Sequence, residues 1–290
     1  MMKTLKGPFW SVPKAISSRS IIEKSWQKRS YTISASNHVI AFFLDLTPSV
    51  RFIVLKRKVN YMKYSVANYV FDQVPSIRFG IIVGSDIKNS PTSQEDSDLL
   101  KEAEVNLRSL VAVENLKTHG NYLNYRQALK AFDINPNKYM NSIEAMSKRV
   151  LKGGSLPRIN ALVDRLNAIA LKYQISLGGH DLKDIHADLS VRRSSSDDIF
   201  LPFGQTEFEA MPQGEMIFTS GNEVQTRYWL WRQSELGKMT LDTNQVFFQM
   251  VGFDANLEKA IEETENLIRE RFGGNYKTFI VDKEIRSIEF

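Results

Sequence analysis

The sequence predicts an α+β fold, a single mixed domain in which helices pack on an antiparallel, sandwich-like sheet. Three observations predict it. With 290 residues, of which 42% are hydrophobic and 24% charged, the chain is long enough to bury a substantial core. Between residues 93 and 173 apolar side chains recur at helical spacing, and after residue 185 the spacing changes to two, which is typical of strands.

Two strands are expected before the helices, at Tyr64 to Val70 and at Ile77 to Val83, with a turn at Pro75-Ser76. Four helices follow. They cover Ser93 to Val111, Asn121 to Phe132, a segment capped by Asn141 or Ser142 that ends at Gly153-Gly154, and Ile159 to Tyr173.

The second half of the chain predicts further strands and one more helix. The strands are expected at 187–192, 199–202, 215–219, 223–231 and 245–251, with Ser220-Gly221-Asn222 as a hairpin turn. A helix is expected at 255–271, and a strand at 277–281 completes the sheet.

Charge divides the chain into two segments. Residues 1–61 hold eleven basic and two acidic side chains, a net charge of +9, whereas residues 62–290 carry a net charge of −4. We interpret 1–61 as a basic extension outside the fold and 62–290 as the folded domain. Residues 1–36 also resemble an organellar transit peptide in composition, but 39–58 is too apolar for one, so we expect a cytoplasmic protein.

Composition excludes several classes of protein. The absence of cysteine excludes disulfides and thiolate metal sites, and the six-residue spacing of His180 and His186 is no zinc motif. No apolar run is long enough for a membrane helix. There is no GxGxxG, Walker, GxSxG or HExxH motif, so we expect neither a metal nor a cofactor.

A dispersed set of polar residues is the main functional signal. Asn160 and Asp164 lie on a predicted helix, the loop after it contains Gly178-Gly179-His180, and Tyr228 to Glu235 precedes Thr240 and Thr243. Polar residues on an otherwise apolar helix face also serve simply as caps of a neighbouring loop, so this structural alternative stays open.

These residues resemble the B3/B4 domain of the phenylalanyl-tRNA synthetase beta subunit, which is the editing domain of the bacterial enzyme. The resemblance runs from about Asn121 to Val251, and no single motif in it is specific. The matching pieces, in order, are Tyr125-Arg126, Asn135-Pro136, Asn141 to Ala145, Lys148 to Val150, Leu156 to Asn160, Val163-Asp164, Asn167, Gly178 to Leu182, Gly214-Glu215, Trp231 to Gln233, Thr240 and Thr243.

The resemblance implies hydrolysis, in trans, of a wrongly attached amino acid from the 3′ end of a tRNA. It implies Glu235 and His180 as the catalytic residues, although the bacterial pocket histidine aligns with Gly178 and His180 matches the archaeal and eukaryotic form instead. The substrate-binding residues that it implies are Arg158, Asn160, Asp164, Gly178, Gly179, Trp231, Arg232 and Thr243. The chain is too short for a whole beta subunit, and no catalytic core for charging tRNA is visible.

Each of these residues also has a structural interpretation. His180 is then a hydrogen-bonded loop residue, and Arg232 or Lys238 forms an ion pair with Glu235. Trp229 and Trp231, two apart on a predicted strand, share a face that is either core or a stacking platform for the terminal adenine. The alternative function is a non-catalytic module that binds RNA or an amino acid, and a third is a domain that docks on a synthetase.

Overall fold

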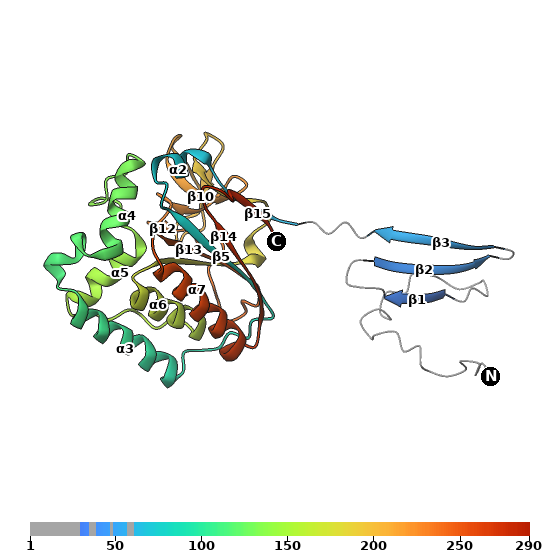
Figure 1. Ribbon diagram of the computed structural model, residues 1–290, viewed down its shortest axis with the longest axis horizontal. Coiled ribbons are helices and arrows are strands. Elements are labelled where there is room, and N and C mark those ends of the chain that lie inside the picture. Colours follow the sequence, from blue (N-terminus) through green and yellow to red (C-terminus); the bar gives the residue numbers. More distant parts are fainter. Residues whose placement is uncertain (1–29, 35–38, 47–48, 57–60) are drawn as a thin grey trace. The chain divides into compact units, whose positions relative to one another are not determined.

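The structure is a computed structural model that describes residues 30–34, 39–46, 49–56 and 61–290. Contacts within the chain divide it into two units, Met1–Tyr61 and Met62–Phe290. The described part of the first unit forms an antiparallel sheet in the order β1 (Ser30–Ser34), β2 (Val39–Leu46), β3 (Ser49–Lys56) (Figure 1). These strands were not predicted, because the continuous apolar runs of β2 and β3 hide the alternation that marks a half-buried strand.

Two sheets build the second unit. Within residues 61–290 the larger sheet has eight strands in the order β15-β4-β7-β10-β11-β8-β9, with β12 paired to β11. Its strands are β4 (Lys63–Val66), β7 (Leu189–Arg193), β8 (Ile199–Phe200), β9 (Glu209–Ala210), β10 (Met216–Ser220), β11 (Glu223–Arg227), β12 (Arg232–Gln233) and β15 (Ser287–Glu289). The sheet is mixed, because β4 with β7 and β8 with β11 are parallel pairs.

The smaller sheet is antiparallel throughout. Its order is β14 (Asn275–Val281), β5 (Arg78–Ser85), β13 (Val246–Gly252), β6 (Ser176–Asp181). The two sheets share a core: the ring of Phe247 on β13 lies 5.5 Å from that of Tyr64 on β4 and 5.9 Å from that of Phe218 on β10. The predicted α+β, sandwich-like class is therefore confirmed, with one of the two sheets mixed rather than antiparallel.

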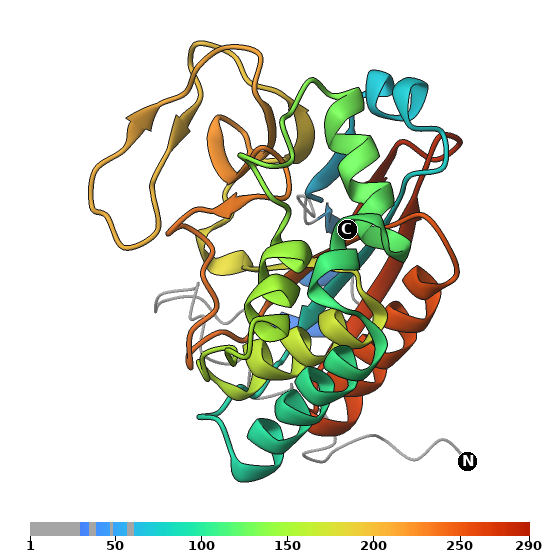
Figure 2. The same ribbon diagram turned by 90° about the vertical axis from the view of Figure 1, so that its left-hand side faces the viewer.

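Two helices cover the smaller sheet on its other side, α6 (Ala161–Tyr173) and α7 (Asn256–Asn266), which the π-helical η3 (Leu267–Arg271) extends. The other α-helices are α2 (Asn68–Gln73), α3 (Gln94–Leu110), α4 (Gly120–Ala131) and α5 (Ser142–Leu151), of which α2 and α4 contribute to the core that the two sheets share. Apolar residues of α6 and α7 form one core with β5 and β13, and α3 and α7 both pack against α6. Figure 2 shows α3 (teal), α6 (yellow-green) and α7 (red) side by side.

Helix starts follow the sequence closely. Ser93 and Asp96 form a reciprocal capping box at α3, and the Asn141 and Asn160 side chains cap α5 and α6 by accepting backbone N–H bonds. These caps satisfy N–H groups that have no partner within the helix. Within the described ranges, no helix has the length and apolar character needed to cross a membrane.

Three predicted elements were wrong. The strand expected at 64–70 ends at Val66, and α2 follows it. The loop expected around Gly178 is strand β6, whose backbone pairs with β13 despite its two glycines. The strand expected at 223–231 ends at Arg227, because Tyr228 and Trp229 adopt the left-handed conformation, with φ of 44° and 60°. The short strands β9 and β15 were not predicted.

Candidate functional site

The candidate site lies where β6 meets the segment that joins β12 to β13, which we call the 234–245 loop. β6 pairs with β13 in the register Gly178 to Gln249, Gly179 to Phe248 and His180 to Phe247. The side chain of Gln233, just before the loop, donates from Nε2 to the Gly179 carbonyl oxygen over 3.0 Å. The loop therefore starts against the glycine pair of β6.

His180 lies beneath this loop and is only 2% exposed. Its ring packs against Phe218 at a centroid distance of 5.1 Å, and its Nδ1 atom has no hydrogen-bond partner among the described residues. Burial lowers the pKa of His180 to about 4, because the charged imidazolium loses its hydration. The imidazole is therefore neutral near pH 7, and its burial opposes protonation for as long as water is excluded.

Gly237 brings the loop backbone directly onto His180. A β-carbon at Gly237 would lie 3.2 Å from Nδ1 of His180 and 3.0 Å from Oε1 of Gln225, a second buried atom without a partner in the described part. The Gly237 N–H donates to Asp184 Oδ2 over 3.2 Å, and its carbonyl accepts from the Asp181 N–H over 2.8 Å. With φ of 70°, Gly237 also has a conformation that favours glycine.

Asn160 connects the same loop to the start of α6. Its Oδ1 accepts from the Val163 N–H over 3.0 Å, and its Nδ2 donates to the Met239 carbonyl over 3.2 Å. The Met239 side chain packs against Gly179, where no larger residue would fit without a shift. Asn160 is thus a cap and a loop anchor at once.

Thr243 fixes the far end of the loop to β6. Its hydroxyl donates to Asp181 Oδ2 over 2.6 Å and accepts from the Thr240 N–H over 2.8 Å. Thr243 is only 1% exposed, so this charge-assisted bond lies away from water.

Glu235 lies on the rim of the site, two residues before Gly237. Its Oε2 accepts from the Gly204 N–H over 2.9 Å, and its Oε1 forms an ion pair with Lys238. The hydrogen bond from Lys238, followed by that from Gly204, lowers the pKa of Glu235. The ionised carboxylate has these two partners, and no contact in the described part joins it to His180.

Arg158 and Asp164 stabilise the region where α6 begins. The guanidinium of Arg158 lies 3.1 Å from Glu104 and donates to the Ser97 carbonyl, also over 3.1 Å, so it is held by α3. Buried Asp164 accepts from Thr92 Oγ1 over 2.6 Å and from the Ile159 N–H over 2.9 Å. No contact in the described part joins Arg158 to His180 or Glu235.

Trp231 and Arg232 lie next to each other beside β12. The Trp231 ring lies 5.2 Å from Tyr139 and 5.6 Å from Tyr228, and the Arg232 guanidinium lies 5.9 Å from the Trp231 centroid. Trp229 is a core residue, 1% exposed, so the expectation that the two tryptophans share one strand face was wrong. The left-handed turn at Tyr228 and Trp229 separates them.

The structure therefore divides the predicted residues into groups. His180, Gly179 and Asn160 contact the 234–245 loop, Glu235 and Thr243 belong to it, and Gly178 lies beside them on β6. Arg158 and Asp164 act on α6, and Trp231 with Arg232 precedes the loop. Gln225, Gly237 and Met239 also belong to the site and were not predicted; only Gly237 carries a sequence signal, as a glycine in a turn.

This arrangement can supply a neutral imidazole and an ionised rim carboxylate. Gly178 of β6 also leaves room for a ligand to approach the backbone, whereas Met239 occupies the space beside Gly179. Among the described residues no group of three His, Cys, Asp or Glu side chains is placed to hold a metal ion.

Comparison with known proteins identifies the domain. The B3/4 domain family matches residues 124–271, slightly more than half of the 290 residues. The chain belongs to the B3/4 domain family.

Among solved structures, the chain is similar to an N-terminal fragment of the phenylalanyl-tRNA synthetase beta-subunit from Pyrococcus horikoshii. The identity is 11% and the TM-score 0.37, and the match covers 78% of this chain and 56% of that fragment. The chain thus spans little more than half of the fragment. No curated protein matches the sequence.

Proposed function

We propose that this B3/4 domain hydrolyses a misattached aminoacyl ester from the 3′ end of a tRNA, acting in trans. The observation that carries the proposal is His180, a neutral, buried imidazole next to the glycines of β6 and covered by one loop. An aminoacyl ester is already activated, so the site needs a positioned water and a stabilised oxyanion rather than a protein nucleophile.

Each residue of the site then has a defined task. Once the 234–245 loop moves aside and water reaches the site, Nδ1 of His180, which has no partner among the described residues, accepts the proton of the attacking water. It then returns this proton to the ribose oxygen that leaves as the ester C–O bond breaks. Glu235, ionised on that loop, attracts the positive α-amino group of the substrate. Gly178 admits the ester close to the backbone, and Gly179 does so once Met239 moves with the loop. Thr243 keeps the C-terminal end of the loop on β6, and the bond from Asn160 to the Met239 carbonyl holds the loop in its closed position.

The acceptor end of the tRNA would be bound mainly by stacking. Residues 62–290 carry a net charge of −4, which limits phosphate contacts. Trp231, with Arg232 over its ring, offers a stacking surface for an unpaired base and a cation for the adjoining phosphate.

A second candidate is a non-catalytic module that binds RNA or an amino acid, or that docks on a synthetase. This function is favoured because two of the polar side chains assigned to the substrate already have partners within the protein. Glu235 is paired with Lys238, and Arg158 is paired with Glu104. In this case His180 is a packed core residue.

Deacylation assays separate the two functions. The purified protein is incubated with a panel of labelled aminoacyl-tRNAs, beside Glu235→Ala, His180→Gln and, as a matched control, Glu207→Ala at an exposed position. If the domain is a hydrolase, the wild type and Glu207→Ala should deacylate at least one aminoacyl-tRNA faster than the background rate. The deacylation rates of Glu235→Ala and His180→Gln should then be lower by about 10-fold or more. Equal background rates for all four proteins would reject hydrolysis and favour the binding module.

A further inference from the structure

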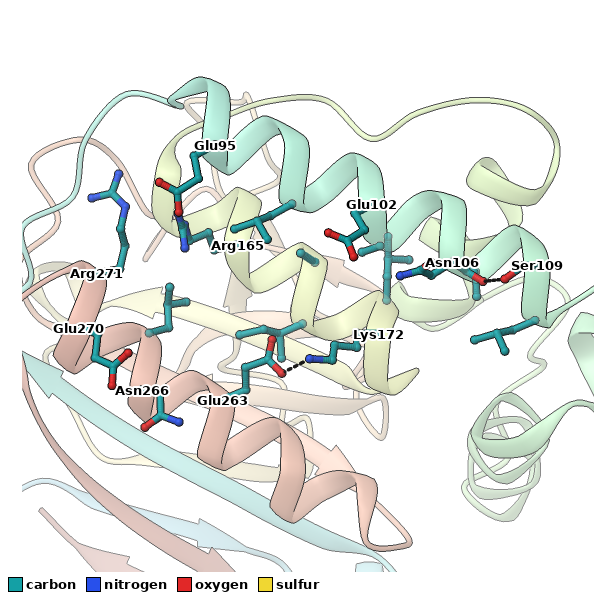
Figure 3. Close-up of a pocket in the computed structure, with 18 residues that line it drawn as sticks. Glu95, Glu102, Asn106, Ser109, Arg165, Lys172, Glu263, Asn266, Glu270 and Arg271 are labelled. Carbon is teal, nitrogen blue, oxygen red and sulfur yellow. Dashed lines mark hydrogen bonds and ion pairs between the residues drawn. The ribbon is translucent and has the colours of Figure 1, made fainter.

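A groove on the helical layer is separate from the candidate site. It lies over α6 between α3 and the α7–η3 segment, has a volume of 760 Å³, and contains none of the residues assigned to the candidate site (Figure 3). Its walls and floor are formed by side chains of all three helical segments.

The groove is elongated. The lining residues of α3 run from Glu95 to Leu110, which is about 22 Å at 1.5 Å per residue and corresponds to about four helical turns. Figure 3 shows Glu95, Glu102 and Asn106 spread along this one face of α3. A trough of this length matches the contact face of a helix better than it matches a compact small molecule.

An apolar strip runs along the groove. Leu99 and Leu110 of α3 line it and are 37% and 64% exposed. The buried or half-buried lining residues between them are also apolar: Ala103, Leu107, Ala168, Ile169 and Leu171. Leucines at i, i+4 and i+7 of a docked helix would cover this surface.

The basic side chains of the groove already have acidic partners. Arg165 pairs with Glu95 and Asp96, Lys172 with Glu263 over 2.6 Å, and Arg271 with Asp96 over 3.2 Å. These pairs neutralise the basic side chains of the groove. The acidic residues without such a partner therefore determine the sign of the electrostatic potential along its rim.

The lining of the groove has a small excess of negative charge. It contains four acidic side chains, Glu95, Glu102, Glu263 and Glu270, and three basic ones, Arg165, Lys172 and Arg271, which all have acidic partners. Among the lining residues of the described part, Glu102 has no ion-pair partner, and Glu270 has only Arg269 at 3.7 Å. A ligand with positive charge along both edges complements this surface.

We infer that the groove binds an amphipathic helix of another protein, with an apolar face toward α6 and Lys or Arg side chains toward α3 and α7. Nucleic acid and anionic lipid are disfavoured because their phosphates would face Glu102 and Glu270. A second copy that places α3 or α7 in the groove is disfavoured as well, since each of these helices carries a net charge of −3.

The test uses a designed probe and the full chain. A fluorescein-labelled 16-residue peptide carries leucine at i, i+4, i+7 and i+11 and lysine on both flanks, and fluorescence polarisation measures its binding. The control peptide keeps the leucines and replaces each lysine by glutamate, so it has the same apolar face and the opposite charge.

Protein variants locate the binding. Leu110→Glu is expected to weaken binding about 10-fold or more, because it charges an apolar contact, and Glu102→Lys about 3-fold. The matched controls are Val105→Glu, 50% exposed on α3 but outside the groove, and Glu262→Lys, exposed on α7 and outside the groove. Both are expected to bind as the wild type does.

Each outcome decides the inference. Saturable binding of the lysine peptide that only the two groove variants weaken supports it. The inference is overturned by no saturable binding, by equal binding of the glutamate peptide, or by equal losses in all four variants. It is also overturned if sedimentation shows self-association of the chain that Leu110→Glu abolishes, because the occupant is then a second copy.

Discussion

The terminal methyl of Met239 lies against Gly179 so closely that a β-carbon on Gly179 would come within 2.5 Å of it. The sulfur of Met239 would be 2.9 Å away. The side chain thus fills the space that the missing side chain of Gly179 leaves on β6. Since Met239 belongs to the 234–245 loop, the fit between this loop and β6 depends on one glycine.

Gly179→Ala is expected to destabilise the protein by about 1 to 3 kcal/mol, because the added methyl forces Met239 to move. Met239→Ala should remove the conflict, so the double variant loses less than the sum of the single losses. Chemical denaturation measures all three. Gly178→Ala is the control, since its β-carbon would meet nothing nearer than 3.8 Å and should change stability little.

Gly237 tests a different constraint in the same loop. Gly237→Ala adds a left-handed alanine and places a methyl 3.0 Å from Gln225 Oε1, so we expect a loss of about 2 to 4 kcal/mol. Gly204→Ala has a similar φ of 79° with nothing within 4 Å, and should lose only about 1 to 2 kcal/mol. Equal losses in both variants would show that the contact with Gln225 and His180 contributes nothing.

Much of the fold could be predicted from periodicity, and the failures have physical causes. The helix at 161–173 follows from apolar spacing and the cap at Asn160. Strand β6 was missed because Gly178-Gly179 is typical of a loop, and only the pairing partner β13, some seventy residues later, makes it a strand. The turn at Trp229 depends on two residues with positive φ, which no sequence pattern marks.

The site was predictable only in part for a similar reason. The sequence indicated a constellation that includes His180, Asn160 and Thr243. His180 and Asn160 do contact the 234–245 loop, and Thr243 belongs to it. The contacts of Arg158 with Glu104 depend on how α3 packs on α6, which is a tertiary relationship without a local signature.

Substitution of Arg158 shows whether this residue has a structural or a substrate-binding role. Arg158→Ala is expected to lower the free energy of unfolding by about 2 to 4 kcal/mol, because it leaves nearly buried Glu104 without its charged partner. Glu104→Gln should lose less, and the double variant should show strong coupling in a double-mutant cycle. Loss of deacylation with unchanged stability would instead assign Arg158 to the substrate.

Removal of residues 1–61 tests the division of the chain into two units. We propose that 62–290 folds alone, so a protein that starts at Met62 should keep the melting temperature of the full chain within about 2 °C, because removal of a separate unit exposes no core. Differential scanning calorimetry compares the two proteins. A much lower melting temperature would show that residues 1–61 stabilise the domain.

The lowered pKa of His180 predicts how the free energy of unfolding depends on pH. Its pKa is about 4 in the folded protein and about 6.5 when unfolded, so between these values the unfolded state binds the proton and the folded state does not. The free energy of unfolding therefore falls as the pH is lowered from 6.5 to 4, by about 3 kcal/mol from this residue alone.

His180→Gln cannot take up this proton. The stability difference between the wild type and His180→Gln should accordingly shrink by about 3 kcal/mol between pH 7 and pH 4 in urea unfolding, whereas exposed His186→Gln should follow the wild type. A difference that stays constant with pH would mean that His180 titrates in the folded protein as a solvated histidine does, and would show that burial does not lower its pKa.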